Sequence, residues 1–257
     1  MSAGAYRRFV ALGDSTTEGL EDPGIATSRY RGWADRLAER LAELEPDLLY
    51  ANLAIRGRKL GQIRAQQLAP ALAMEPDLVS VVGGVNDVLR PRADADALAA
   101  EMEAMVEAFS GSGATVLLMT YPDFGEIMAP ARRLSPRLHA FNGHLRTIAA
   151  RHGARLMDLE AGGPMDARLF HPDRLHANSA GHERIAFAAA EALGLPGASG
   201  AWREPLPPAP RASRVQRLRA DGAWARAHLA PWVGRRLRGV SSGDGVEPKR
   251  PEPAPVA

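Results

Sequence analysis

Four short blocks of the sequence carry side chains that could together perform nucleophilic chemistry. Ser15 lies in GDSTTEG, and His176 ends HPDRLH three residues after Asp173, while Gly57 and Asn86 lie between these blocks. A serine hydroxyl needs a base such as imidazole to become a good nucleophile, and imidazole needs a carboxylate that fixes its tautomer. The set is therefore suited to acyl transfer through a serine.

Within this set each residue has an expected role. We expect Ser15 to be the nucleophile, His176 the general base and Asp173 the group that orients His176. An acyl-transfer site also needs preorganised donors for the oxyanion, and the N–H groups of Ser15 and Gly57 and the amide of Asn86 are the candidates.

The order GDS, a lone glycine, GxND and DxxH resembles the SGNH (GDSL) hydrolases. These blocks are Gly13–Ser15, Gly57, Gly84–Asp87 and Asp173–His176, and the resemblance covers residues 7 to about 193. It implies a flavodoxin-like three-layer α/β/α sandwich and esterase or lipase activity without a metal or cofactor. It also implies the roles given above. Thr16 stands where the family name has leucine, at a position that is not catalytic.

Neighbouring residues have simpler interpretations. Three neighbouring residues are expected to contact the catalytic residues rather than the substrate: Asp14, Gly84 and Asp87. We expect Asp14 to hydrogen-bond the surrounding loops and Gly84 to allow close approach of the backbone. His171 is a rival base, but His176 has the carboxylate at the family spacing. We therefore expect His171 to be structural or at the rim of the site.

The elements that position these residues follow from the hydrophobic pattern. Short apolar runs predict five strands, and 3–4 spacing of apolar residues predicts the helices between them. The strands are expected at 8–12, 48–53, 78–82, 115–120 and 155–159, and the helices at 33–43, 60–73, 93–109, 135–152 and 179–193. This alternation predicts a mostly parallel five-stranded sheet covered on both faces, with ligands at the carboxyl ends of its strands.

Two other functions are weighed against the serine hydrolase. A metal-dependent phosphoesterase could use Asp14, Asn86, Asp87, His171 and His176 as ligands, but no DxH follows the first strand and no HxH appears late in the chain. The second is a non-catalytic binding module on the same fold. No metal ligand is assigned in the preferred interpretation.

Charge divides the chain of 257 residues into two parts. Residues 1–195 carry 21 basic and 25 acidic side chains, whereas residues 196–257 carry 11 and 5 together with 10 of the 20 prolines. We expect a hydrolase domain at 1–195, a Pro-rich linker at 196–210, a basic amphipathic helical segment at 211–240 and a disordered tail at 241–257.

The partners of this chain are less well specified. The substrate is expected to be a small-molecule or lipid-like ester, and acetyl esters, acyl glycerides, lysophospholipids, thioesters and acylated sugars all remain open, as does the oligomeric state. The basic segment is expected to dock on the acidic body, with weak membrane-surface binding as the alternative. No nucleic-acid motif is present. With no signal-peptide pattern, a cytoplasmic location is expected.

Overall fold

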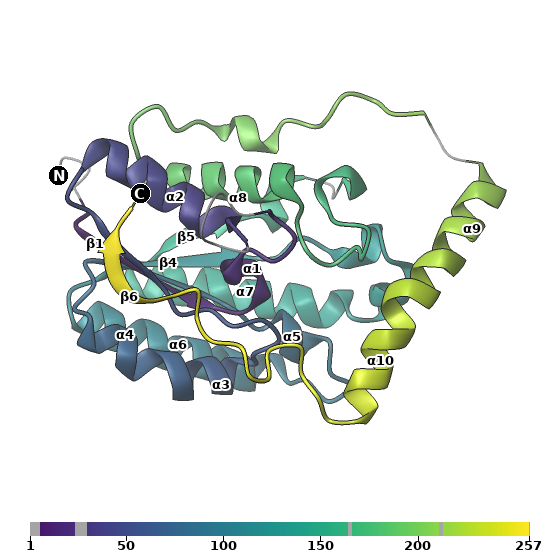
Figure 1. Cartoon of the computed structure of the whole chain (residues 1–257), viewed down its shortest axis with the longest axis horizontal. Coiled ribbons are helices and arrows are strands. Elements are labelled where there is room, and N and C mark those ends of the chain that lie inside the picture. The colour runs from purple at the N-terminus through teal and green to yellow at the C-terminus, as the bar shows by residue number, and fades with distance from the viewer. Residues whose placement is uncertain (1–5, 24–29, 164–165, 211–212, 257) are drawn as a thin grey trace.

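The core of the molecule is one sheet of six strands. A computed structural model describes residues 6–23, 30–163, 166–210 and 213–256. The strand order is β5-β4-β3-β1-β2-β6 (Figure 1). The strands are β1 (Arg8–Gly13), β2 (Leu49–Asn52), β3 (Leu78–Val82), β4 (Thr115–Thr120), β5 (Arg155–Asp158) and β6 (Arg250–Pro255).

Strands β1 to β5 are parallel, and β1 to β4 are largely buried. β1 pairs with β2 on one side and with β3 on the other, and β4 joins β3 to β5. Every residue of β3 is buried, which its run of four apolar residues around Ser80 predicts for a strand covered on both faces. The order 2-1-3-4-5 is that of flavodoxin-like folds, so the expected fold class is confirmed.

Helical layers cover both faces of the sheet. α2 (Gly32–Leu44) packs beside α8 (Ser179–Ala192) on one face, and α6 (Ala95–Gly111) packs beside α7 (Ser135–His152) on the other (Figure 1). The face of α6 and α7 also carries α3 (Leu60–Ile63), the π turn η1 (Arg64–Leu68) and α4 (Ala69–Ala73). The expected helices agree with these elements to within two residues at each end.

Short elements follow the strands. They are α1 (Ser15–Glu18), α5 (Val85–Val88), and the 3₁₀ turns η2 (Phe124–Glu126), η3 (Ala129–Arg133), η4 (Glu160–Gly162) and η5 (Ala167–Leu169). Because β1 to β5 run in parallel, α1 and α5 start at the same edge of the sheet. The candidate site residues lie at this edge.

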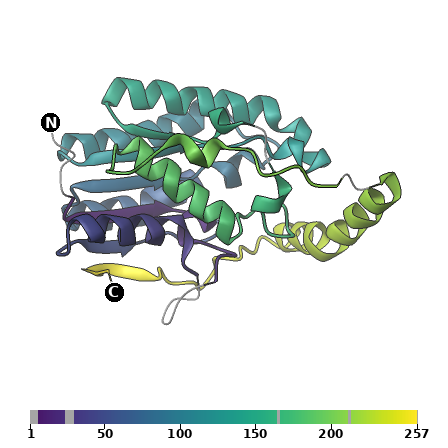
Figure 2. The ribbon, with the colours of Figure 1, turned by 90° about the horizontal axis from the view of Figure 1, so that it is seen from above.

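Residues 196–257 are called here the C-terminal segment, which passes one end of the body and returns to the sheet as its edge strand β6 (Figure 1). They include the 3₁₀ turn η6 (Gly200–Arg203) and a long helix made of α9 (Arg214–Trp224), the π turn η7 (Ala225–Leu229) and α10 (Ala230–Leu237). We call residues 214–237 the C-terminal helix, and Figure 2 shows it beyond the end of the sheet. Residues 211–212, the start of the expected helical segment, lie outside the described residues.

The expectation of disorder at 241–257 and the count of five strands are both wrong. β6 pairs antiparallel with β2 at the edge of the sheet, with Tyr50 opposite Ala254. Prolines at every second position, as in RPEPAP, are tolerated on an edge strand because the residues between them keep N–H groups for the partner. None of the described helices is long and apolar enough to span a lipid bilayer.

Candidate active site

Ser15 is the first residue of α1, directly after β1. Asp14 caps this helix, since its side chain accepts a hydrogen bond from the Thr16 N–H at 3.1 Å. Gly13 has φ +155°, and a Cβ there would lie 2.3 Å from the Val82 carbonyl oxygen. Only glycine fits this sharp turn, which brings the Ser15 side chain to the carboxyl edge of the sheet.

Gln67 holds the same turn from the neighbouring helical layer. Its amide oxygen accepts from the Gly13 N–H at 2.8 Å, and its amide nitrogen donates to the Gly13 carbonyl at 2.9 Å. Gln67 is buried and lies in the π turn η1, a distortion that is frequent near functional sites. Sequence reasoning missed this residue because a glutamine within a polar stretch of helix gives no local signal.

The residues of HPDRLH, His171–His176, form a loop that faces Ser15. His176 Nε2 lies 3.0 Å from Ser15 Oγ, and its Nδ1 lies 2.7 Å from Asp173 Oδ2. The other carboxylate oxygen, Asp173 Oδ1, accepts from the N–H groups of Leu175 at 2.9 Å and His176 at 3.0 Å. Three predicted residues from opposite ends of the chain are thus joined by hydrogen bonds.

The environment of Asp173 favours its ionised form. Burial by itself would raise the pKa of Asp173, but the hydrogen bonds and the charge of His176 outweigh it and hold the pKa well below the usual range. An ionised Asp173 can accept the Nδ1–H of His176, which leaves Nε2 free to accept a proton from Ser15.

The three candidate oxyanion donors lie after β1, β2 and β3. As the first residue of α1, Ser15 has an N–H with no acceptor inside the helix. Gly57 has φ +74° in a turn closed by a hydrogen bond from Arg58 N–H to the Ile55 carbonyl, a position that favours glycine. The Asn86 amide donates to Asp14 at 3.0 Å and to the Arg58 carbonyl at 3.1 Å, so it must exchange one partner to reach an oxyanion.

A buried ion pair links two of these segments. The Arg56 guanidinium is hydrogen-bonded to the Glu18 carboxylate, which also accepts from the Arg56 N–H at 2.8 Å. Both side chains are largely buried. This contact joins α1, which carries Ser15, to the turn that carries Gly57, and sequence reasoning did not identify it.

Asp14, Asp87 and Gly84 lie next to the candidate site residues at the carboxyl edge of the sheet. Burial raises the pKa of Asp14 to about 6. Asp87 Oδ2 accepts from the Leu60 N–H at 3.0 Å, and burial also raises the pKa of Asp87. A Cβ on Gly84 would lie 2.6 Å from the Phe141 ring, which is the close approach expected there.

His171 contacts Asp173 rather than Ser15. Its Nδ1 accepts from the Asp173 N–H at 3.3 Å, and its Nε2 lies 3.3 Å from Glu21 Oε2. Among the residues described, the side chains close enough to share a metal ion are Glu21, His171 and Asp173. Asp14, Asp87 and His176 of the phosphoesterase alternative do not belong to this group.

The C-terminal helix contacts the HPDRLH loop directly. Trp224 Nε1 donates to the Asp173 carbonyl at 2.8 Å, and Arg174 stacks on the Trp224 ring and pairs with Asp221 at 2.6 Å. Arg174 has φ +63°, an unusual conformation for a residue with a side chain. The one available signal was compositional, because Trp224 and Trp232 are unexpected in a pure linker.

Residues beyond that helix cover the Gly57 turn. A Cβ on Gly57 would lie 2.4 Å from Ser241 Oγ, and a Cβ on Gly243 would lie 2.0 Å from the Arg56 carbonyl oxygen. The C-terminal segment therefore contacts both the Gly57 turn and the HPDRLH loop. It is part of the surroundings of the site.

Two cavities lie near the hydrogen-bonded residues, and one of them is lined by Asp173 and His176. One, of about 120 Å³, extends from Thr16 along Tyr121 and Phe124 toward Trp202. The other, of about 240 Å³, lies between Asp173 and His176 on one side and the C-terminal helix on the other. Leu175 lines both cavities.

Comparison with known proteins gives one family match. Residues 11–184 match the GDSL-like Lipase/Acylhydrolase family. No curated protein matches the chain.

Solved structures of similar fold include two kinds of enzyme. Axe2, an acetylxylan esterase from Geobacillus stearothermophilus, is 23% identical at a TM-score of 0.62, covering 76% of this chain and 97% of its own. LAE5, an alpha/beta hydrolase from the metagenome of Lake Arreo, Spain, is 22% identical at a TM-score of 0.61, covering 73% and 95%.

Proposed function

Because the chain belongs to the GDSL-like lipase/acylhydrolase family and is a carboxylic ester hydrolase, we propose that it works through an acyl-enzyme on Ser15. His176 Nε2 takes the proton of Ser15 Oγ as Oγ bonds to the ester carbonyl carbon. The tetrahedral intermediate then expels the alcohol, whose oxygen receives the proton from His176. The alcohol leaves neutral, and the acyl group stays on Ser15.

Water completes the cycle by the same route. His176 takes a proton from a water molecule as the water oxygen attacks the acyl carbonyl carbon. The bond between this carbon and Ser15 Oγ then breaks. The proton returns from His176 to Ser15 Oγ, which releases the acid and restores the enzyme. Asp173 stays ionised throughout and stabilises the imidazolium.

The oxyanion formed in both steps needs donors that are already in place. The N–H groups of Ser15 and Gly57 and the amide of Asn86 take this role in the proposal. Removing one such donor typically raises the barrier by about 3 kcal/mol. Asp14, whose carboxylate accepts from the Asn86 amide, acts by positioning that amide.

One observation carries the proposal: a single imidazole lies 3.0 Å from Ser15 Oγ and 2.7 Å from the Asp173 carboxylate. A structural serine that only caps a helix has no need of such an imidazole. The arrangement is the one that a serine nucleophile requires.

The test is hydrolysis of p-nitrophenyl acetate with and without EDTA. We expect activity that survives EDTA, falls by at least ~10⁴-fold in Ser15→Ala, and is accompanied by labelling of Ser15 with a fluorophosphonate. Activity that is lost in EDTA but retained in Ser15→Ala would refute this mechanism in favour of the metal-dependent alternative. Absence of both labelling and turnover would favour a binding module.

The division of the chain is also part of the proposal. Residues 1–195 form the hydrolase domain, followed by the linker 196–210 and the helical segment 211–240. The family match ends at residue 184, which supports a domain boundary before the C-terminal segment. The contacts of Trp224 and Arg174 support docking of the helical segment on the body.

A further inference from the structure

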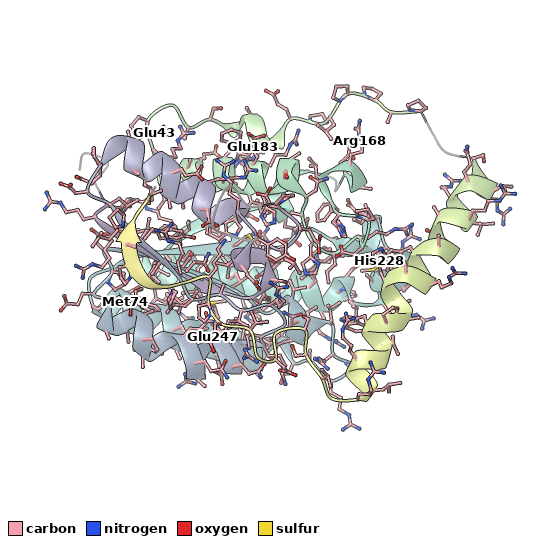
Figure 3. The ribbon with its side chains drawn as sticks, viewed as in Figure 1. Glu43, Met74, Arg168, Glu183, His228 and Glu247 are labelled. Carbon is pink, nitrogen blue, oxygen red and sulfur yellow. The ribbon has the colours of Figure 1, made fainter. Side chains whose placement is uncertain are left out.

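The cavity of about 240 Å³ is built jointly by the body and the C-terminal helix. Leu89, Met128 and Leu175 line it from the body, and Trp224, Leu229 and Trp232 line it from the helix. His228, labelled in Figure 3, lies on the helix side that faces the body, and its ring contacts that of His171 at 6.0 Å between centroids. Without the helix this cavity has no outer wall.

The cavity borders His176, the imidazole that must protonate the leaving alcohol. Asp173 and His176 line it, whereas Ser15, Gly57 and Asn86 do not. In the proposed mechanism His176 Nε2 protonates the leaving oxygen, so the alcohol must pass beside this imidazole. The alcohol portion of the ester is therefore the part that this cavity can receive.

The size and lining of the cavity indicate an apolar alcohol. Eight of its twelve lining residues are apolar. An engineered cavity of about 150 Å³ is enough to bind benzene, so 240 Å³ admits a group of six or more carbons. A group rich in hydroxyls, such as a sugar, would face a wall on which apolar residues outnumber polar ones two to one, and hydroxyls buried without partners are costly.

We propose that the C-terminal helix forms the binding site for the alcohol portion of the substrate, and that this portion is an apolar group of six or more carbons. The inference rests on the proposed serine mechanism, because the position of the leaving oxygen relative to His176 decides which part of the ester enters the cavity. It assigns a substrate-selecting role to a segment outside the family match.

The opposite face of the same helix supplies matched controls. Val233 is 38% exposed and Leu237 is 83% exposed, and neither lines the cavity. They lie four positions apart and share one face of α10. Trp232 and His228, which also lie four positions apart, by contrast line the cavity. Substitutions on one face of the helix thus change side chains that line the cavity, and substitutions on the other face do not.

The experiment compares ethyl acetate with hexyl acetate, which share one acyl group. Each buried methylene raises kcat/KM by up to about fourfold, so we expect the wild-type enzyme to prefer hexyl acetate by at least about tenfold. Trp232→Ala should reduce this preference by about tenfold, and Ala227→Leu, which adds volume to the wall, should also reduce it. Val233→Ala and Leu237→Ala should keep the wild-type ratio.

Three results would overturn the inference. The first is equal kcat/KM for the two acetates in the wild-type enzyme. The second is faster turnover of an acetylated xylooligosaccharide than of hexyl acetate, unchanged in Trp232→Ala. The third is a Trp232→Ala effect on a p-nitrophenyl acyl-length series but not on the alcohol series, which would assign the cavity to the acyl group.

Fluorophosphonate labelling separates this inference from the mechanism beneath it. If Ser15 is labelled and esters are hydrolysed while the alcohol preference is absent, the mechanism stands and the cavity assignment is wrong. If Ser15 is not labelled and no acetate is hydrolysed, the mechanism itself fails. Thermal unfolding of each variant shows whether a loss of activity reflects loss of folding.

Discussion

The two sides of the candidate active site are held in place by different kinds of structure. Ser15, Gly57 and Asn86 follow β1, β2 and β3, three adjacent strands whose residues are almost all buried. Asp173 and His176 lie in a loop that follows the 3₁₀ turn η5 rather than a strand, and Trp224 of a later helix donates to the Asp173 carbonyl. One side depends on the core and the other on a contact near the surface.

This difference indicates which kind of substitution would displace the residues on each side. A side chain at the end of a buried strand moves only if the sheet is disturbed, because interiors are close-packed. A loop held by a tryptophan and an arginine can shift when one contact is lost, while the rest of the fold stays intact. Substitutions on the two sides should therefore separate effects on stability from effects on turnover.

The largest expected effect is on turnover and comes from the loop. Asp173→Asn should lower kcat by about 10⁴-fold, because an amide favours the wrong tautomer of His176 and cannot stabilise the imidazolium. Steady-state hydrolysis of p-nitrophenyl acetate measures it. A drop of less than tenfold would mean that Asp173 does not orient His176.

The strand-end side is the one that a parallel-sheet pattern could predict. The apolar runs before Ser15 and Gly84 identified β1 and β3, and parallel strands end at one edge, so their following residues had to meet. The family resemblance was correct, as the match over residues 11–184 establishes. His176 could be placed with them only because its spacing from Asp173 is that of the family.

The next effect concerns the attachment of the C-terminal segment to the body. Lys249 is largely buried, donates to the Arg31 carbonyl at 2.8 Å and pairs with Asp35, whose pKa burial raises to about 6. Lys249→Met leaves Asp35 buried without its partner, and should lower the free energy of unfolding by about 3–5 kcal/mol.

Urea denaturation measures this loss, and two further variants interpret it. Glu252→Gln, at an exposed position of β6, should leave the free energy of unfolding unchanged. Adding Asp35→Leu to Lys249→Met should recover much of the loss, since no buried carboxyl then lacks a partner. An unchanged stability in Lys249→Met alone would mean that β6 contributes little to holding the segment.

A third effect tests how the strand-end side responds to pH. Burial raises the pKa of Asp14 from 3.8 to about 6, so the folded protein binds this proton more tightly than the unfolded chain. The resulting stabilisation is complete below about pH 4 and is lost as the pH rises through 6, a change of about 3 kcal/mol. Asp14→Asn should remove it.

Urea denaturation at pH 4 and pH 8 isolates this contribution. Asp35 and Asp87 also have raised pKa values but are present in both proteins, so the difference between wild-type and variant reports Asp14 together with its charge interaction with Asp87. We expect the variant to lose less stability than the wild-type protein between these two pH values. Equal losses would mean that Asp14 is not a buried titrating group.

The role of the C-terminal segment was the part that local patterns could not predict. RPEPAP has too many prolines to indicate a strand, and only the edge position beside β2 accommodates them. Trp224 and Asp173 are 51 positions apart, and nothing in either local sequence indicates their contact. Tertiary contacts of this kind depend on where the linker places the helix, which its composition leaves open.

The smallest effect bears most directly on the comparison of the two sides. Trp224→Phe keeps a ring beneath Arg174 but removes the hydrogen bond to the Asp173 carbonyl, which is worth about 1 kcal/mol. If the HPDRLH loop depends on this contact, kcat should fall about fivefold with KM for ethyl acetate unchanged. Leu218→Ala, at an exposed position of α9, should leave kcat unchanged. A fall in thermal stability with unchanged kcat would instead mean that Trp224 only anchors the helix, and that the loop holds Asp173 by its own hydrogen bonds.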